Sequence, residues 1–233
     1  MNILTYNNTP FSSFHCYVDG SLSFTSPEKD YELVEVLGRD GTLAINNDRF
    51  RNIDIEIPCH INKDFATNYR NLMAFLNAQN GYLKFEISIE PLHFRKALLQ
   101  TLTEPTVSQS DRSGTFSIVF TAMPQRWLKS GEEWTTFTSN GTITNPTLFD
   151  SKPIIRIFGA GQVGVGSETI TLTQAGTSYV DVDCETMDAH EGATNFNQYL
   201  EVTDFPVLHS GSNGITLGTG VTKVEIQPRW YEI

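Results

Sequence analysis

Three glycines in the second half of the chain suggest nucleotide chemistry. Gly159, Gly161 and Gly164 have the G-x-G-x-x-G spacing of a dinucleotide-binding loop, and they follow an apolar run that predicts a strand. Asp181 and Asp183 come about twenty residues later, where such a site places the carboxylate that binds ribose. In that chemistry, the N–H groups at the start of a helix hold the pyrophosphate. The residues after the third glycine would therefore have to form a helix.

Those residues predict a strand instead. Val165, Ile170 and Leu172 lie among threonines, and β-branched residues at a period near two favour a strand over a helix. Residues 174–177 then predict a turn into another strand at 178–183. We therefore interpret the glycines as a β-turn or bulge between antiparallel strands, and we reject the nucleotide site.

Other catalytic chemistry has little support in the sequence. His190 and His209 lie in polar loop sequence, and no G-x-S-x-G motif provides a serine nucleophile. Asp181 and Asp183 could form a glycosidase pair, but strand carboxylates on one face near a turn are more often solvated or calcium-binding. We therefore expect no enzymatic activity and no cofactor.

Two His–Cys pairs raise the question of zinc. His15–Cys16 and Cys59–His60 both lie in strand-like sequence, where adjacent side chains point to opposite faces, so each pair offers one ligand to a given site. The three cysteines are odd in number and far apart, which implies no disulfide framework. We expect buried, reduced cysteines and no metal.

The charge balance argues against a phosphate-binding surface. The chain has 16 basic and 27 acidic residues, a net charge of −11, whereas nucleic-acid affinity comes mainly from lysine and arginine. Such a protein can still form a passage through which DNA moves without sticking. No run of about eighteen apolar residues predicts a membrane span, and the N-terminus lacks the features of a signal peptide.

Alternating patterns in the first half predict antiparallel strands. Asp19–Gly20 predicts the turn of an early hairpin. A longer strand is expected at residues 31–37, followed by a turn at 38–41 and a polar tip at 46–48. Residues 53–57 then alternate isoleucine with acidic residues, which predicts a strand with one buried face.

Residues 63–79 predict one α-helix. Apolar residues recur there at steps of three and four, Asn62 is a candidate N-cap, and Asn80–Gly81 is a candidate stop. A helix among strands most often covers a sheet, so we interpret the apolar stripe as core. The stripe consists of Phe65, Tyr69, Leu72, Met73 and Leu76.

A change in composition divides the chain. Residues 129–146 are rich in Ser, Thr, Asn and Gly, which places a domain boundary near residue 135. Short strand patterns with tight turns follow. The sequence thus predicts a mainly β protein with two antiparallel β-sandwich domains, residues 1–135 with the helix and residues 136–233 without one.

Carbohydrate binding is the alternative function that the second domain suggests. β-Sandwiches often bind sugars by stacking an aromatic ring on the sugar ring, although Trp230 continues an apolar alternation and fits a core position. The aromatic candidates are Trp127, Trp134, Tyr179, Trp230 and Tyr231.

Several stretches together resemble the distal tail proteins of long-tailed, siphovirus-type bacteriophages of Gram-positive hosts. In the second half these are PTLFDSKPIIRIFGAG (146–161), YVDVDCETMDA (179–189) and FPVLHSGSNGITL…VTKVEIQPRW (205–230). In the first half they are GRDG (38–41), the single helix and FSIVFTAMPQRWLKSGEEW (116–134). The order and spacing of these stretches carry the resemblance, which covers nearly the whole chain.

The resemblance implies a structural role in the virion, at the tail tip or baseplate. The first domain would form a homohexameric ring, and the second would be a galectin-like or carbohydrate-module-like sandwich. The ring would act as a hub between the tail tube protein and the tail-associated protein, in some phages with receptor-binding proteins at its periphery. This chain lacks room for the inserted carbohydrate module of some family members and lacks the galectin H-x-N-x-R pattern, so fold likeness does not carry sugar binding across.

A ring requires contact surfaces on each subunit, and two polar, extended stretches are candidates. These are residues 38–49 and residues 104–114, whose alternative interpretation is ordinary solvated loop. Asp54 or Glu56 would line the DNA passage, since like charges repel DNA. The candidate subunit-contact residues are Arg39, Asp40, Asn47, Asp48, Gln109, Asp111 and Arg112.

Overall fold

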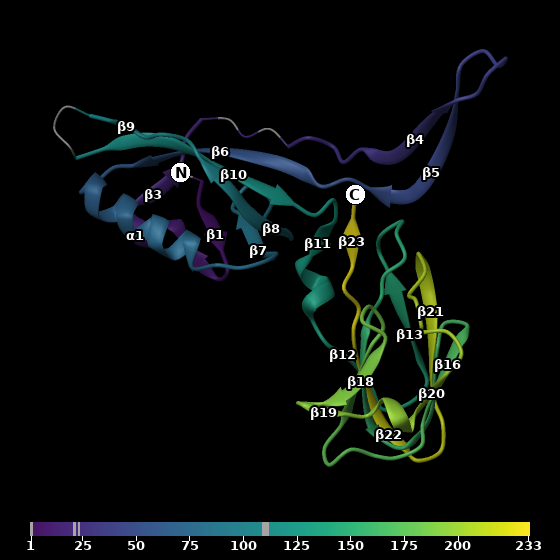
Figure 1. Ribbon diagram of the computed structural model, residues 1–233. Helices are drawn as coiled ribbons and strands as arrows, with labels where there is room; N and C mark the ends of the chain where they lie inside the picture. The colour runs from purple at the N-terminus through teal and green to yellow at the C-terminus, as the bar shows by residue number, and fades with distance from the viewer. Residues whose placement is uncertain (1, 21, 23, 109–111) are drawn as a thin grey trace. The chain divides into compact units, whose positions relative to one another are not determined.

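The protein consists of two compact units. The structure, a computed structural model, describes residues 2–20, 22, 24–108 and 112–233. The first unit comprises residues 1–126 together with Ile233, and the second comprises Trp127–Glu232 (Figure 1). The prediction of a mainly β, antiparallel protein is confirmed, and the described residues contain a single α-helix.

The first unit is built on one antiparallel sheet that curls back on itself. Its strands pair in the order β2-β1-β7-β8-β10-β6-β3, and β9 adds to β10. A bridge between Asn2 and Val18 connects the two sides of the sheet, because Val18 N–H donates to the carbonyl of Asn2 at 3.2 Å. The elements are β1 (Leu4–Tyr6), β2 (Thr9–Pro10), the 3₁₀ helix η1 (Phe11–Phe14), β3 (Cys16–Val18), β6 (Ile53–Ile61), α1 (Phe65–Asn77), β7 (Leu83–Ile87), β8 (His93–Leu102), β9 (Thr106–Val107) and β10 (Gly114–Ala122).

The buried face of this sheet follows the predicted alternation. In β6 every second residue is buried, from Ile53 to Ile61, and β10 repeats the pattern from Gly114 to Ala122. Helix α1 packs Phe65, Leu72 and Leu76 into the same core and Tyr69 against it, so the predicted helix and most of its stripe are confirmed. The core cluster does not include Met73, and Phe75 packs against it instead. The predicted N-cap is wrong, since Asp64 precedes the helix in a left-handed conformation and makes no capping hydrogen bond.

Two local predictions in the first half are wrong. Cys16–Val18 does not form a hairpin with the residues after Asp19–Gly20; it pairs with β6, where Cys16 lies opposite Ile61. The polar residues 46–48 form no tip, because β5 (Thr42–Phe50) runs through them. The chain accommodates Asp48 as a bulge, with φ of 51° and a shift of register against β4 (Lys29–Glu35).

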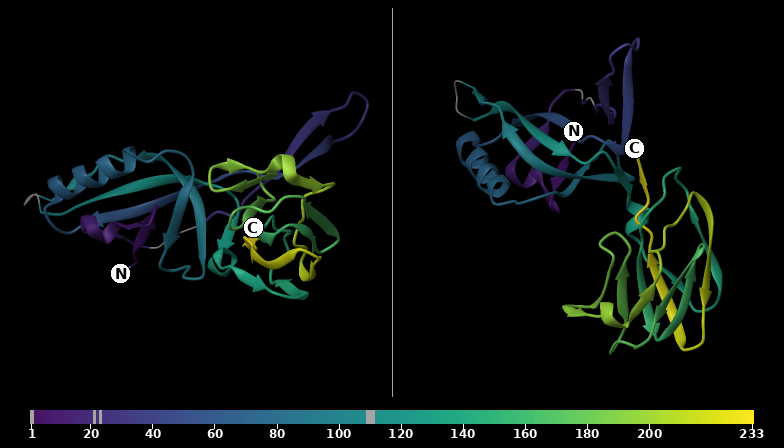
Figure 2. Two further views of the ribbon diagram at one scale, coloured as in Figure 1. Left: turned by 90° about the horizontal axis from the view of Figure 1, so that it is seen from below. Right: turned by 45° about the vertical axis from the view of Figure 1, so that its right-hand side comes forward.

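The second unit is a sandwich of two antiparallel sheets (Figure 2). One sheet has the order β12-β22-β14-β17-β18-β19, the other β13-β21-β15-β16-β20, and one core contains side chains from both. The elements are β11 (Arg126–Leu128), η2 (Lys129–Glu132), β12 (Thr135–Phe137), β13 (Gly141–Asn145), β14 (Ile154–Gly159), β15 (Gly161–Val165), β16 (Glu168–Leu172), β17 (Val180–Asp183), β18 (Asp188–Glu191), β19 (Thr194–Asn195), η3 (Asn197–Tyr199), β20 (Leu200–Val202), β21 (Gly211–Leu217), β22 (Val221–Gln227) and β23 (Tyr231–Glu232).

The glycines of the rejected nucleotide motif lie where the chain passes from one sheet to the other. Gly159 ends β14 in the first of these sheets and Gly161 begins β15 in the second, and both have positive φ. A Cβ on Gly159 would lie 2.2 Å from the carbonyl oxygen of Gly220, and one on Gly161 would lie 2.3 Å from that of Thr219. These glycines therefore permit a close backbone crossing. The strand predicted after them is β16, but β14 and β15 do not pair with each other.

The boundary between the units lies between Arg126 and Trp127, before the position near residue 135 that composition predicts. Residues of η2 belong with the second unit because Gly131 accepts a 2.8 Å hydrogen bond from the N–H of Arg229. Gly131 also lies so close to Trp230 that a Cβ there would meet its nitrogen at 2.4 Å. No helix among the described residues has both the length and the apolar character needed to cross a membrane.

The second unit should depend strongly on its buried alternation. Ile170 is fully buried in β16, and Ile170→Ala is expected to lower the free energy of unfolding of this unit by about 2–5 kcal/mol, because a large cavity remains. Its exposed neighbour provides the control, since Thr169→Ala is expected to cost under about 1 kcal/mol. Tryptophan fluorescence during urea unfolding measures both, because Trp127, Trp134 and Trp230 all lie in the second unit. Equal effects would contradict the assignment of faces.

Candidate functional site

The hairpin of β4 and β5 exposes an unusual number of large apolar side chains. The two strands form a sheet of their own, with no third strand among the described residues. Leu33 is 65% exposed, and Leu37 at the turn is fully exposed. The exposed large apolar side chains of this hairpin are Tyr31, Leu33, Val36, Leu37, Leu43 and Ile45.

The register places apolar side chains on both faces of the hairpin. Leu33 lies opposite Ala44 on one face, whereas Val34 lies opposite Leu43 on the other. A ribbon of two strands cannot bury either face by itself, and an isolated hairpin is marginally stable in water. The hairpin is therefore suited to contact with another surface.

An ion cluster fixes the base of the hairpin. Asp30 is buried and accepts hydrogen bonds from Arg49 Nε at 2.7 Å and from Arg51 Nη2 at 2.7 Å. The hydrogen bonds from Arg51 and then Arg49 lower the pKa of Asp30 to about 2. The carboxylate therefore stays ionised and holds both ends of the hairpin together at neutral pH.

The structure separates the predicted contact residues of this region into two groups. Arg39 and Asp40 lie in the exposed turn between the strands. Asn47 and Asp48 lie toward the other end of β5, near the base of the hairpin, where Asp48 accepts a 2.6 Å hydrogen bond from the side chain of Asn46. All four residues are exposed, so both pairs are accessible for contact.

A second candidate surface lies at the opposite end of β6. The hairpin joins β6 near Ile53, whereas β9 and the start of β10 lie beside Ile61. Arg112 is exposed there, while Gln109 and Asp111 fall outside the residues that the structure describes. A hollow of about 310 Å³ adjoins these strands, and its lining includes His60, Ile61, Thr106, Val107, Ser113 and Gly114.

Sequence reasoning missed the apolar character of the hairpin. The polar turn and the polar residues 46–48 were selected from the sequence, whereas the structure also exposes Leu33 and Leu37 before the turn and Leu43 and Ile45 after it. A signal was present, since Leu33–Val34 and Val36–Leu37 place apolar side chains at consecutive positions. In a strand that is covered on one face only, apolar and polar residues would alternate instead.

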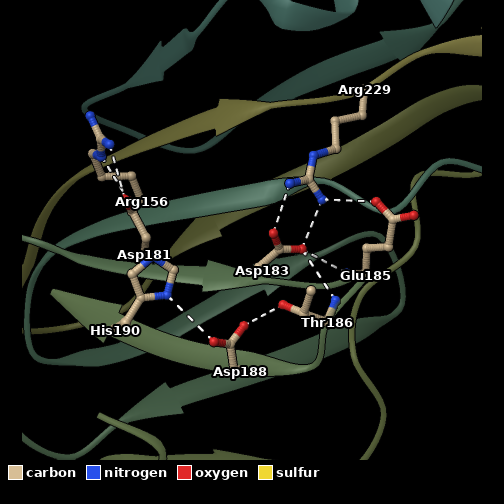
Figure 3. Close-up of polar contacts among 8 residues, drawn as sticks. All are labelled: Arg156, Asp181, Asp183, Glu185, Thr186, Asp188, His190 and Arg229. Atoms are coloured by element: carbon tan, nitrogen blue, oxygen red, sulfur yellow. Dashed lines mark hydrogen bonds and ion pairs between the residues drawn. The ribbon is translucent and has the colours of Figure 1, made fainter. Parts of the chain in front are cut away.

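The second unit carries a polar network that fastens its C-terminal segment (Figure 3). Arg229 donates from Nη1 and Nη2 to the two carboxylate oxygens of Asp183, each at 2.7 Å. Glu185 N–H also donates to Asp183, at 2.9 Å. Burial raises the pKa of Asp183, but the hydrogen bonds from Arg229 and Glu185 outweigh burial and leave it below its ordinary value. The network is a structural clamp.

The other acid of the rejected ribose site is also engaged. Arg156 donates to both oxygens of Asp181, at 2.7 and 3.0 Å (Figure 3). The same guanidinium lies 4.3 Å from the ring centre of Trp134 and 4.0 Å from that of Tyr179. Both aromatic rings therefore already have a cation on one face.

The remaining aromatic candidates do not form an open sugar platform. Trp127 and Trp230 are buried, and Tyr231 stacks on Phe149 with ring centres 5.7 Å apart. The candidate sugar-stacking residues thus serve packing and charge pairing in this unit.

The histidines do not assemble with a nucleophile. His190 Nδ1 lies 3.7 Å from Asp188, and His209 Nδ1 lies 3.0 Å from Asp150, in separate parts of the unit. Within residues 2–20, 22, 24–108 and 112–233, no three His, Cys, Asp or Glu side chains gather as metal ligands. Each of these two histidines thus lies beside a single carboxylate of its own.

Solved structures of phage proteins have the same fold. The SPP1 Dit protein, described as a paradigm of the hub adsorption apparatus in phages that infect Gram-positive bacteria, matches over 100% of both chains with a TM-score of 0.71 and 12% identity. A chain of the phage P2 baseplate in its activated conformation with Ca matches over 97% of both chains, with a TM-score of 0.54 and 11% identity. The same baseplate with Sr matches over 97% of this chain and 98% of that one, with a TM-score of 0.51 and 12% identity.

The likeness is one of structure rather than of sequence. Neither protein-family models nor curated protein sequences give a match. The fold nevertheless extends over the full length of the SPP1 Dit protein, both units included.

The Asp183–Arg229 clamp should make a measurable contribution to the second unit. Arg229→Met leaves a mostly buried carboxylate without its main donor, so the free energy of unfolding is expected to fall by about 1.5–3 kcal/mol at pH 7. Glu185→Gln is the control, because the Glu185 side chain is exposed and its one contact with Arg229 is a 3.4 Å ion pair. The free energy of unfolding is expected to change by under about 0.5 kcal/mol in this variant. Tryptophan fluorescence in urea provides the comparison.

The same clamp predicts a pH dependence. The pKa of Asp183 is lowered on folding, so its stabilisation is complete above the ordinary value of 3.8 and is lost as the pH falls through the lower, folded value. The difference between the unaltered protein and Asp183→Asn is therefore expected to shrink below about pH 4. A difference that stays constant down to pH 2 would contradict this account.

The Asp30 cluster should control the order of the hairpin. Asp30→Asn removes the charge that Arg49 and Arg51 share, so amides of β4 and β5 are expected to exchange hydrogen faster at pH 7 while β6 and β10 stay protected. Asp40→Asn, in the exposed turn, is the matched control and is expected to leave exchange unchanged. Mass spectrometry of the exchanged peptides measures this. Equal protection of β4 and β5 in both variants would contradict the role of Asp30 in anchoring the hairpin.

Proposed function

We propose that this protein is the structural hub of a phage tail tip, and that its first unit forms a homohexameric ring. The observation that carries the proposal is the match in fold to the SPP1 Dit hub protein over the full length of both chains. The P2 baseplate chains, which share the fold with both units, support the same role. The protein would thus be a component of the virion.

The two surfaces of the first unit suit a ring. A closed ring with head-to-tail contacts needs two different patches on each subunit, placed so that repeated contact closes. The apolar hairpin and the β9–β10 end lie at opposite ends of β6, as such contacts require. Leu33 and Leu37 would supply the apolar contact area, and Arg39 and Asp40 would supply charged contacts at its rim.

The acidic side chains of β6 suit the passage that a tail requires. Asp54 and Glu56 point away from the core, and Asp54 accepts a 2.7 Å hydrogen bond from the hydroxyl of Thr121 on β10. On the inner wall of the ring, these carboxylates would repel the phosphates of double-stranded DNA and let it pass without binding. A basic inner wall would be incompatible with this part of the proposal.

The partners follow from the position of a hub. The tail tube protein would bind one side of the ring and the tail-associated protein the other, with receptor-binding proteins at the periphery in some phages. Sugar binding by the second unit, residues 136–233 in the predicted division, is the competing function. The cation over Trp134 and Tyr179 and the burial of Trp127 and Trp230 favour the hub instead.

Oligomeric state and a hairpin variant test the proposal together. The purified protein is expected to form hexamers by light scattering and six-fold rings by negative-stain imaging. The double variant Leu33→Lys, Leu37→Lys is expected to weaken assembly at least about 30-fold, because charge replaces the apolar contact area. Leu148→Lys is the matched control, since Leu148 is 89% exposed in the second unit, and it is expected to assemble normally.

The outcomes separate the parts of the proposal. A hexamer that both variants form equally well would remove the hairpin from the interface while leaving the ring. A monomer at all concentrations for the unaltered chain would contradict self-assembly. Binding of the second unit to cell-wall sugars in a pull-down would then favour the carbohydrate-binding alternative.

A further inference from the structure

Arg95 is a buried cation without a hydrogen-bond partner. It lies in β8, is 7% exposed, and its Nε donor is buried without an acceptor among the described residues. The nearest carboxylate oxygen, Glu90 Oε2, lies 3.7 Å from this nitrogen, which is an ion-pair distance but too long for a hydrogen bond. Buried polar groups are nearly always paired, so this guanidinium requires an explanation.

The neighbouring charges do not complete the pairing. Glu90 directs its other oxygen, Oε1, to Arg126 Nη1 at 3.1 Å, so one carboxylate serves two guanidinium groups. Burial lowers the pKa of Arg95, the charge of Glu90 opposes that change, and the charge of Arg126 adds to it. The ring of Phe24, 5.3 Å from Cζ, contributes only a weak attraction.

A cavity adjoins this guanidinium. Its volume is about 300 Å³, and it lies within the first unit. Thr25 and Ser26, two residues with hydroxyl groups, are among the residues that line it. The full lining is Phe24, Thr25, Ser26, Pro27, Glu90, Arg95, Arg126 and Ile233.

We propose that this cavity binds a small oxyanion, a carboxylate in particular, which accepts hydrogen bonds from Arg95. The planar guanidinium presents paired donors that match a carboxylate, and hydrogen bonds between charged groups are among the strongest in proteins. Thr25 and Ser26 on the lining would add hydroxyl donors. A cavity of about 300 Å³ is at the lower limit for ligand sites, which suits a single acidic group rather than a nucleotide.

The same chemistry has two sources, an acidic side chain of a partner protein or a free anion from solution. Both would relieve the cost of a buried charge that lacks a full partner. The proposal concerns a group at Arg95 and stands independently of the ring.

Two variants and three probes test the site. Thermal unfolding of the unaltered protein is measured with N-acetyl-glutamate amide, with sodium phosphate and with sodium chloride at equal ionic strength. The blocked glutamate is expected to raise the unfolding temperature by several degrees over chloride in the unaltered protein and in Arg112→Met, because a ligand that binds the folded state stabilises it. Arg95→Met, of similar length and uncharged, is expected to lose this difference. Arg95→Lys is expected to retain only part of it.

A spectroscopic titration keeps the test independent of how well the variants fold. In the ¹⁵N-labelled, unaltered protein, the Nε–H resonance of Arg95 is expected to shift downfield and saturate as blocked glutamate is added. Stronger saturation by phosphate would assign the site to free anions, and stronger saturation by blocked glutamate to a protein side chain. No shift with either probe, or equal thermal effects in the unaltered protein and Arg95→Met, would overturn the proposal.

Discussion

A two-stranded ribbon cannot bury its own side chains, and this constraint decides what the β4–β5 hairpin of the first unit exposes. The β4–β5 hairpin has apolar residues on both faces, yet none of its strands joins the main sheet. The fold keeps the ribbon in shape with charge rather than with a core, because Asp30 binds Arg49 and Arg51 at its base. The cluster orders the hairpin without covering it, and the apolar faces remain available to another chain.

The second unit differs, because its arginines pair with carboxylates and aromatic rings of the same unit. Arg156 and Arg229 each hold a carboxylate at the sheet surface, and Arg156 also covers two aromatic rings. Motifs that suggested a ribose site or a sugar platform thus serve to fasten strands and the terminal segment. The fold is shared with the SPP1 Dit protein, but a shared fold does not by itself carry a binding site across.

The sequence predicts those parts of the structure that depend on local periodicity. The alternation of β6 and the stripe of α1 are visible because each residue's environment repeats at a fixed interval. Strand partners are not local. Cys16 pairs with Ile61, 45 positions further along the chain, instead of forming the expected hairpin. The bulge at Asp48 depends on a left-handed backbone conformation at this residue, which the amino-acid composition does not predict. Arg95 and its cavity depend on four separate segments, and no pattern in the sequence brings them together.

The pairing of the first strand has a consequence for how the chain folds during synthesis. Leu4 and Tyr6 are fully or nearly fully buried, but their partners Ile87 and Phe85 lie about eighty residues further along. Strand β2 follows β1 directly in the chain, but at ribosomal rates of about 5–20 residues per second β1 waits about 4–16 s for its other partner, β7. During that interval the edge of β1 that will pair with β7 stays exposed. The first unit can therefore complete its main sheet only after the middle of the chain has been synthesised, so the N-terminal strand depends on residues made long after it.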